Sequence, residues 1–307
     1  MTNVRRPVPN VRRVPAPSES ARSSLAILDP EELALHPFGQ KLDPILDRTR
    51  ADVARRREQV PIEELKKRAT GHTPRGFARA LRRASALGPA VIAELKKASP
   101  SKGLIRSDFD PRSLAVSFER CGAAALSVLT DEPFFQGSLG NLEAASAATR
   151  LPCLRKDFIV DEYQIVEARA HRADAILLIA GALDRASLHH FTTIAHSYGL
   201  DVLCEVHTRE ETENVRDMGA DLYGVNNRDL KTFEVRLETS LELAGQLPPG
   251  AVHVAESGIY TATDIQSLRH AGFHACLIGE SLMRQPDPGK ALADLLQAAS
   301  DPVAERA

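Results

Sequence analysis

Short apolar runs alternate with longer amphipathic segments from about residue 90 onward. The runs are four to eight residues long, as expected for strands that are covered on both faces. The longer segments repeat their apolar positions with a helical period, and three are followed by a glycine that suits a left-handed cap, namely Gly199, Gly219 and Gly272. The predicted strands are Val91–Leu95, Ala124–Leu129, Leu151–Phe158, Ala175–Ile179, Val202–Val206, Leu222–Val225, Ala251–Ala255 and Ala275–Ile278. The predicted helices between them include Leu114–Arg120, Asp161–His171, Arg185–Tyr198, Glu210–Met218, Leu237–Leu247 and Thr263–His270.

Eight strands that alternate with helices predict an α/β protein built on a parallel sheet. Eight strands also close a (β/α)8 TIM barrel, for which about 250 residues are enough. An open, doubly wound sheet is the alternative. No G-x-G-x-x-G motif opens the first helix, however, so nothing favours a dinucleotide-binding version of that fold.

The chain before the barrel divides into two parts. Residues 1–37 begin with a stretch of about 24 residues that holds four prolines, five arginines and one acid, so we predict a mostly disordered extension. Such a composition also occurs in organelle transit peptides, but no amphipathic apolar pattern supports that alternative. Helical spacing runs from Phe38 to Arg68, with Pro61 suited to the start of a second helix, and a short helix is predicted at Phe77–Ala84. Residues 38–300 are therefore predicted to form one catalytic barrel domain with an N-terminal helical extension.

Composition and charge exclude several classes of protein. A net charge of −2 gives no overall field that would favour nucleic acid or an acidic membrane. No apolar run reaches the roughly 18 residues of a membrane-spanning helix. The four cysteines are widely spaced, and Cys153, Cys204 and Cys276 lie in apolar runs, as expected for reduced core residues and not for a disulfide set or a metal site. We therefore expect a cytoplasmic protein without a nucleic-acid partner, a membrane partner or a metal.

Charged and amide side chains recur where the predicted strands end. Because side chains alternate between the two faces of a strand, Ile92, Glu94 and Lys96 share the inward face of the first strand. Catalytic residues of TIM barrels lie at the carboxyl ends of the strands, so we interpret these side chains as a candidate active site. The alternative is that they face solvent or neutralise one another in a structural network. The same parity places on the inward face the side chains of Lys156, Phe158, Glu205, Asn226, Arg228 and Glu256.

Glycine and serine follow the last two predicted strands. Glu256-Ser257-Gly258 follows the seventh strand, and Gly279-Glu280-Ser281 follows the eighth. Small residues let backbone N–H groups approach a phosphate, and TIM barrels often bind phosphate at this position. The sequence thus predicts a phosphate site, and with it a phosphorylated small-molecule ligand.

The same segments resemble the indole-3-glycerol phosphate synthase family, in the order of that family and from about Phe38 to the C-terminal region. The Glu-x-Lys-x-x-Ser-Pro-Ser pattern at 94–101 is the most specific of them. The Gly/Ser segments are less specific. The other matching segments are SVLTD at 127–131, LRKDF at 154–158, EVH at 205–207, GVNNRDL at 224–230, AESGI at 255–259 and LIGESLM at 277–283.

The resemblance implies a reaction and a set of proton-transfer roles. The family's substrate is 1-(2-carboxyphenylamino)-1-deoxyribulose 5-phosphate, whose aromatic ring attacks the ribulose carbonyl before carbon dioxide and then water are lost. Lys156 would be the general acid, with a pKa that its surroundings shift toward neutral. Glu205 would be the general base, Glu94 would orient Lys156 or share proton transfer, and Lys96 would hold the carboxylate or phosphate and take part in dehydration.

The resemblance also implies how the substrate is held. Asn226, Arg228, Glu256 and Ser99 would contact its hydroxyls and carboxylate, and Phe158 would stack near the anthranilate ring unless it is simply a core residue. Some relatives carry Ser at position 280, so only backbone binding is expected there. The reaction requires no cofactor, and we expect a monomer or a weak homodimer. The phosphate would be bound by Ser257, Gly258, Gly279 and the backbone at Glu280 and Ser281.

Two other functions fit a phosphate-binding barrel. A sugar-phosphate isomerase such as phosphoribosylanthranilate isomerase uses a Cys and an Asp, which Glu94 and Lys96 on the first strand argue against. A non-catalytic barrel would bind its ligand without turnover. His207 follows Glu205 and is interpreted here as a rim residue more readily than as a catalytic one.

Overall fold

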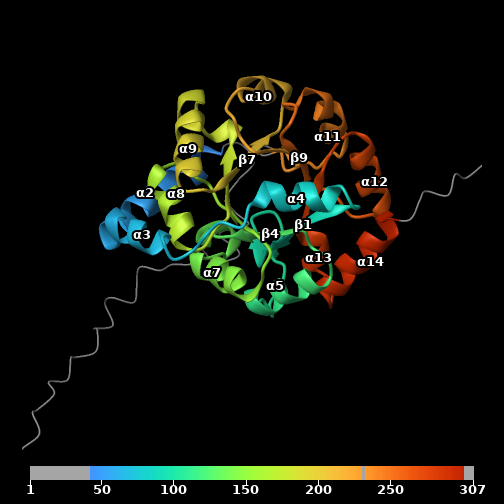
Figure 1. Cartoon of the computed structure of the whole chain (residues 1–307), viewed down its shortest axis with the longest axis horizontal. Coiled ribbons are helices and arrows are strands. Elements are labelled where there is room, and N and C mark those ends of the chain that lie inside the picture. The colour runs from blue at the N-terminus through green and yellow to red at the C-terminus, as the bar shows by residue number, and fades with distance from the viewer. Residues whose placement is uncertain (1–41, 230–231, 301–307) are drawn as a thin grey trace, which may run out of the picture. The chain divides into compact units, whose positions relative to one another are not determined.

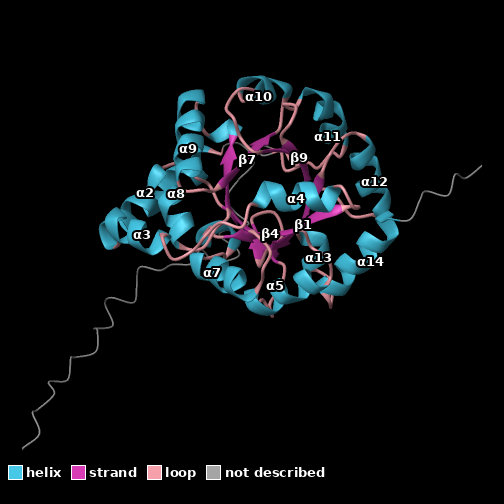
Figure 2. Cartoon of the chain, viewed as in Figure 1, coloured by secondary structure: helices cyan, strands magenta, loops and turns pink. Residues whose placement is uncertain are grey.

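Eight parallel strands close into a barrel in the computed structural model, which describes residues 42–229 and 232–300 (Figure 2). The first strand pairs with both the second and the last, which closes the sheet without a free edge. The predicted TIM barrel is therefore confirmed, whereas the disorder predicted for residues 1–37 lies outside the described residues. The barrel strands are β1 Ala90–Leu95, β4 Ala125–Leu129, β5 Cys153–Lys156, β6 Ala175–Ile179, β7 Asp201–Val206, β8 Leu222–Asn226, β9 Val252–Glu256 and β10 Ala275–Ile278.

Helices follow the strands around the outside of the barrel (Figure 1). Most begin at a polar side chain that accepts a backbone N–H of the first turn, as Asp110 and Asp184 do. The predicted left-handed caps at Gly199 and Gly272 are confirmed, with φ of 71° and 99°, whereas Gly219 has a φ of 74° but lies beyond the end of α10 at Asn214. The outer helices are α5 Pro111–Arg120, α7 Leu139–Ala148, α8 Glu162–Ala170, α9 Arg185–Ser197, α10 Arg209–Asn214, α11 Glu238–Leu243, α12 Ala262–His270 and α14 Pro288–Ser300. Shorter elements are α6 Glu132–Phe135, α13 Glu280–Met283, the 3₁₀ turns Ala180–Ala182 and Ala244–Gln246, and the hairpin strands β2 Ala98–Ser99 and β3 Gly103–Leu104.

Several predicted boundaries were too wide. The segment Leu151–Phe158 forms a strand only over Cys153–Lys156, because Asp157 leaves the ladder and accepts the N–H of Phe158. The predicted helix Glu210–Met218 ends at Asn214. The predicted helix Leu237–Leu247 is α-helical only over Glu238–Leu243 and continues as a 3₁₀ turn over Ala244–Gln246. Propensity alone does not locate such ends.

From residue 42 onward, three helices precede the first strand, close to the predicted positions: α2 Asp43–Gln59, α3 Ile62–Ala69 and α4 Phe77–Ser85. In Figure 1, α4 lies across the amino-terminal end of the barrel. Its Phe77 and Leu81 are fully buried in one cluster with the inward-facing Leu154 and Leu222. Helices α2 and α3 instead pack against α8. The extension therefore closes the bottom of the barrel and covers one side of it.

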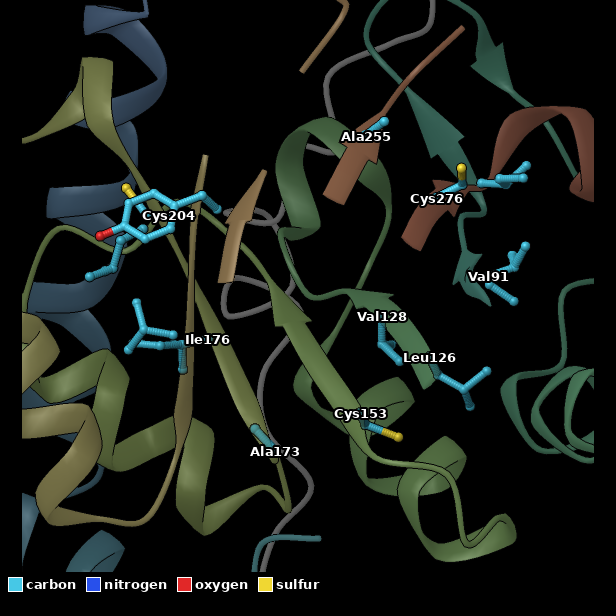
Figure 3. Close-up of a cluster of buried hydrophobic side chains, with 14 of the residues drawn as sticks. Val91, Leu126, Val128, Cys153, Ala173, Ile176, Cys204, Ala255 and Cys276 are labelled. Atoms are coloured by element: carbon cyan, nitrogen blue, oxygen red, sulfur yellow. The ribbon is translucent and has the colours of Figure 1, made fainter. Parts of the chain in front are cut away.

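The apolar side chains of the strands form two clusters, one inside the barrel and one between the strands and the surrounding helices. Leu154, Leu203 and Val254 belong to the inner cluster, as strand parity predicts. The outward-facing side chains pack under the helices, and Figure 3 shows Val128, Cys153 and other members of that layer. Apolar side chains thus form the core along the strands, and polar side chains lie at the carboxyl ends of the strands.

Candidate active site

One pocket lies at the carboxyl ends of the strands. All fourteen residues that the sequence analysis assigned to catalysis, substrate binding or phosphate binding line it. They come from six of the eight strands or from the loops that follow them, so the barrel brings together residues that are far apart in the chain. They are Glu94, Lys96, Ser99, Lys156, Phe158, Glu205, Asn226, Arg228, Glu256, Ser257, Gly258, Gly279, Glu280 and Ser281.

Lys156 lies at the centre of the polar part of the pocket. Its Nζ lies 2.7 Å from Glu205 Oε2 and 2.7 Å from Glu256 Oε2. Both glutamates are 2% exposed, so the ammonium group neutralises charges that water does not reach. An ammonium group has three protons, and these two contacts leave one for another acceptor in the pocket.

The charges of this cluster set the pKa values of its members. Burial alone would lower the pKa of Lys156, but the charges of Glu205, Glu256 and Glu94 outweigh burial and raise it above its ordinary value. The expected shift of the Lys156 pKa toward neutral was therefore wrong. Burial would raise the pKa of Glu205, yet Lys156 and His207 hold it well below its usual range. Burial raises the pKa of Glu256 to about 7, with Lys156 opposing and Glu205 adding to the increase.

Glu94 and Lys96 form a second ion pair on the same inward face of β1. The Glu94 side chain is 2% exposed and that of Lys96 is 20% exposed, so the lysine reaches toward the open side of the pocket. Gly279, at the end of the neighbouring strand β10, lies directly against Glu94. A Cβ atom at position 279 would come within 3.0 Å of the Glu94 Cβ. Gly279 therefore leaves space that Glu94 occupies.

Replacing Gly279 with alanine is expected to displace Glu94 and to lower kcat/KM by about tenfold to a hundredfold, because small misplacements of catalytic groups have effects of that size. Steady-state kinetics would measure the change. Gly245→Ala is the matched control, because no atom lies within 4 Å of the Cβ that it adds. Equal kcat/KM values for the two variants would contradict the importance of this close contact.

The glycine and serine after β9 have an unusual backbone. Ser257 has a φ of 67° and Gly258 a φ of 72°, in the left-handed region. A Cβ at position 258 would lie 2.5 Å from the Val235 Cγ1, so only glycine fits. Asn227 holds this turn, because its Nδ2 donates to the Ser257 carbonyl at 3.0 Å. A strained, well-held turn at the pocket is typical of a ligand-binding loop.

Position 280 has a role that the sequence analysis did not foresee. Glu280 Oε1 lies 3.0 Å from Arg284 Nε, and its Oε2 lies 3.9 Å from Arg228 Nη2. The Arg228 guanidinium also donates to the Phe233 carbonyl at 3.4 Å. The side chain of Glu280 therefore helps to hold Arg228 at the pocket wall.

Sequence reasoning missed part of the pocket wall. Leu42 and Ile45 reach the pocket from the start of the helical extension, and Phe135 packs near Phe158 with ring centroids 6.3 Å apart. Phe135 and Phe158 thus form an apolar wall of the pocket, and Leu42, Ile45 and Tyr260 add further apolar surface to its lining. Only the aromatic pair Phe134-Phe135, in the loop that follows the second strand, could have signalled this wall from the sequence.

Two acids also lie at the pocket without having been predicted. Burial, together with the charge of Asp157, raises the pKa of Asp131 to about 7. Asp157 is held from behind by Arg155, whose Nη2 lies 2.8 Å from its Oδ2, and Arg155 is also paired with Glu167 at 2.9 Å. These contacts support the segment that carries Lys156 and Phe158.

A closed barrel whose strand ends carry lysines paired with buried glutamates beside an apolar wall defines a TIM-barrel enzyme with acid–base chemistry. The family model described as indole-3-glycerol phosphate synthase matches residues 42–295. The chain belongs to this family of carboxy-lyases of tryptophan biosynthesis.

Relatives agree with this assignment. The chain is 58% identical over 255 residues to an indole-3-glycerol phosphate synthase of Koribacter versatilis, covering 83% of this chain and 98% of that protein. It is 51% identical over 253 residues to one of Burkholderia ambifaria, covering 82% and 97%. Among solved structures, a thiamine phosphate pyrophosphorylase of Pyrococcus furiosus matches with a TM-score of 0.52 and 17% identity, over 71% of this chain and 97% of that one. That likeness concerns the fold alone.

Within 42–229 and 232–300, no cluster of three or more His, Cys, Asp or Glu side chains is arranged to hold a metal ion. In the same ranges, no helix is both long and apolar enough to cross a membrane. All four cysteines lie in these ranges and are free thiols, and three of them are buried.

Proposed function

We propose that the chain converts 1-(2-carboxyphenylamino)-1-deoxyribulose 5-phosphate to indole-3-glycerol phosphate by ring closure, decarboxylation and dehydration. The observation that carries this proposal is Lys156, a partly buried ammonium group that two buried carboxylates hold beside an apolar wall. Ring closure needs a proton donor at the ribulose carbonyl and a surface for the aromatic ring, and this arrangement offers both.

Lys156 is the general acid of this proposal. Its raised pKa keeps it protonated, and the proton that Glu205 and Glu256 do not take is available to the carbonyl oxygen. Transfer of that proton leaves the lysine neutral. The pKa of Glu205 then rises, because the charge that mainly held it down has gone. Glu205 thereby becomes a stronger base for the later removal of a proton.

The remaining groups hold the substrate in the proposed complex. Glu94 and Lys96 form a neighbouring pair that can orient the acid and take part in dehydration. Phe158 and the apolar wall accept the anthranilate ring. Hydroxyl and carboxylate groups are assigned to Asn226, Arg228, Glu256 and Ser99, and the phosphate to Ser257, Gly258, Gly279, Glu280 and Ser281.

A direct assay tests the proposed function. The purified protein is given the carboxyphenylamino-deoxyribulose phosphate, and the fluorescence of the indole product is followed over time. Phosphoribosylanthranilate serves as the comparison substrate, since an isomerase on the same fold would use it. Absence of indole at high protein concentration would contradict the synthase assignment, and binding without turnover would favour a non-catalytic barrel.

The pH dependence follows from Glu256. Because its pKa is about 7 in the free protein, it is increasingly protonated as the pH falls through that value. The protonated form no longer neutralises Lys156 and loses acceptor capacity for substrate hydroxyls. We expect kcat/KM to fall on the acid side of about pH 7, and Glu256→Gln to lower kcat/KM and to abolish that limb. An unchanged acid limb in the variant would assign it to another group.

The proposed assembly and location complete the function. We propose a monomer or weak homodimer that acts in the cytoplasm, on a phosphorylated small molecule and not on nucleic acid or membrane. The free thiols Cys153, Cys204 and Cys276 are buried in the core, which suits a reducing compartment. Analytical ultracentrifugation over a range of protein concentrations would test the assembly state.

A further inference from the structure

His207 directly follows β7, and its imidazole lies between two carboxylates. Its Nε2 lies 3.3 Å from Glu205 Oε1, and its Nδ1 lies 3.2 Å from Glu211 Oε2. The side chain is 10% exposed and does not line the pocket. His207 therefore contacts the proposed base from behind, on the side away from the substrate.

Glu211 fixes the position of this imidazole. It lies in the first turn of α10, where its N–H donates to the hydroxyl of the capping Thr208 at 3.1 Å. Its Oε2 also accepts the backbone N–H of His207 at 2.6 Å. Its Oε1 lies against Gly181, where a Cβ would come within 3.0 Å. One carboxylate thus holds both the backbone and the ring of His207.

The two carboxylates determine the charge of the ring. Burial alone would lower the pKa of His207, but hydrogen bonds and charges from Glu205 and Glu211 outweigh it and raise the pKa to about 10. Both ring nitrogens then carry protons, which matches the acceptors on either side. Each oxygen of Glu205 consequently faces a cation, Lys156 at Oε2 and His207 at Oε1, where Asn226 Nδ2 also donates at 3.2 Å.

We propose that His207 is a positioning residue that, as an imidazolium held by Glu211, fixes the orientation of Glu205 and keeps it ionised. This inference rests on the proposed role of Glu205 as the base. The contribution of His207 is greatest after Lys156 has given its proton to the substrate. His207 is then the cation that remains beside Glu205 and holds its carboxylate for the next step.

Three variants test the kinetic consequence. Loss of the cation that lies 3.3 Å from Glu205 Oε1 predicts that His207→Leu lowers kcat by about tenfold to a hundredfold. KM should stay within about twofold, because His207 does not line the pocket. Glu205 must be ionised to act as the base, so its protonation should produce an acid limb in the pH profile of kcat. In His207→Leu this limb should move to higher pH, since removing a cation raises the pKa of a neighbouring carboxyl. His207→Gln, which restores a donor without the charge, should recover part of kcat but not the limb. Glu211→Gln should change kcat in the same direction by less.

A spectroscopic measurement on the wild type decides the charge without substrate. Nitrogen-15 NMR of the histidine ring should show both nitrogens protonated at about pH 8, far above the ordinary histidine pKa. In Glu211→Gln the ring should lose its proton at lower pH. A neutral ring near pH 7, or a folded His207→Leu with the wild-type kcat and acid limb, would overturn the proposal.

The variants and the NMR titration distinguish a failure of the positioning role of His207 from a failure of the proposed function. If His207→Leu does not fold, His207→Gln and the NMR titration decide the question alone. If the wild type turns over its substrate and both His207 variants match it, the function stands and the positioning role fails. A wild type without turnover would remove the base that His207 is proposed to position, and with it this inference.

Discussion

Replacing Lys156 with methionine is expected to lower kcat by about 10² to 10⁴, the range that a general acid supplies. Methionine retains much of the length of the side chain but cannot donate a proton. The substrate should still bind, because the apolar wall and the phosphate loops are untouched. Stopped-flow fluorescence of the indole product would measure turnover, and a fluorescence titration would measure binding.

Controls separate lost chemistry from lost structure. Without Lys156, Glu205 and Glu256 face each other as buried carboxyls, so some loss of stability is expected. Lys156→Met combined with Glu256→Gln removes one of those charges and should recover stability without recovering turnover. Lys290→Met removes a lysine on the surface of α14 and should leave kcat unchanged. Near-normal turnover in Lys156→Met would remove this residue from its proposed role as acid.

The polar side chains at the strand ends could be predicted because their direction depends on local backbone geometry. Side chains alternate along a strand whatever surrounds it, so the inward positions of Glu94, Lys156, Glu205 and Glu256 follow from the strand assignment. All four line the pocket. The same parity correctly assigned the apolar positions before them to the inside of the barrel.

The parts that could not be predicted depend on tertiary contacts. Leu42 and Ile45 reach the pocket only because α2 lies against α8, and no pattern within α2 specifies that contact. Phe135 reaches it because Asp131 caps a one-turn helix, accepting the Phe134 N–H at 2.8 Å. The direction of the Lys156 pKa shift required knowing that two glutamates from other strands meet at its Nζ.

The second large effect is expected at the opposite end of the barrel. Asp174 has no exposed side-chain surface and lies just before β6. Its Oδ2 accepts from Arg75 Nη2 at 2.6 Å and from the Cys153 N–H at 2.7 Å. Its Oδ1 accepts the Arg75 N–H at 2.6 Å and lies 3.1 Å from His72 Nε2. This carboxylate joins the segment before α4 to the starts of two barrel strands.

Asp174→Ala is therefore expected to destabilise the fold by about 3–5 kcal/mol, the cost of removing one partner from a buried ion pair. Arg75 would retain hydrogen bonds to the Ser146 hydroxyl and the Thr149 carbonyl but would lose its counter-charge. Urea unfolding followed by circular dichroism would measure the loss. Asp184→Ala is the matched control, because Asp184 only caps α9 and a cap contributes about 1 kcal/mol.

The pH dependence of the free energy of unfolding provides a second test of the role of Asp174. Burial would raise the pKa of Asp174, but its bonds from His72 and Arg75 outweigh burial and hold the pKa below the ordinary value. A carboxyl with a lowered pKa stabilises the fold fully above its unfolded-state pKa of about 3.9, and this contribution is lost as the pH falls through the folded-state value. The difference in stability between wild type and Asp174→Ala should therefore be constant near neutrality and shrink in acid. A difference that stayed constant down to the acid unfolding of the wild type would mean that the stabilisation does not come from the charge of Asp174.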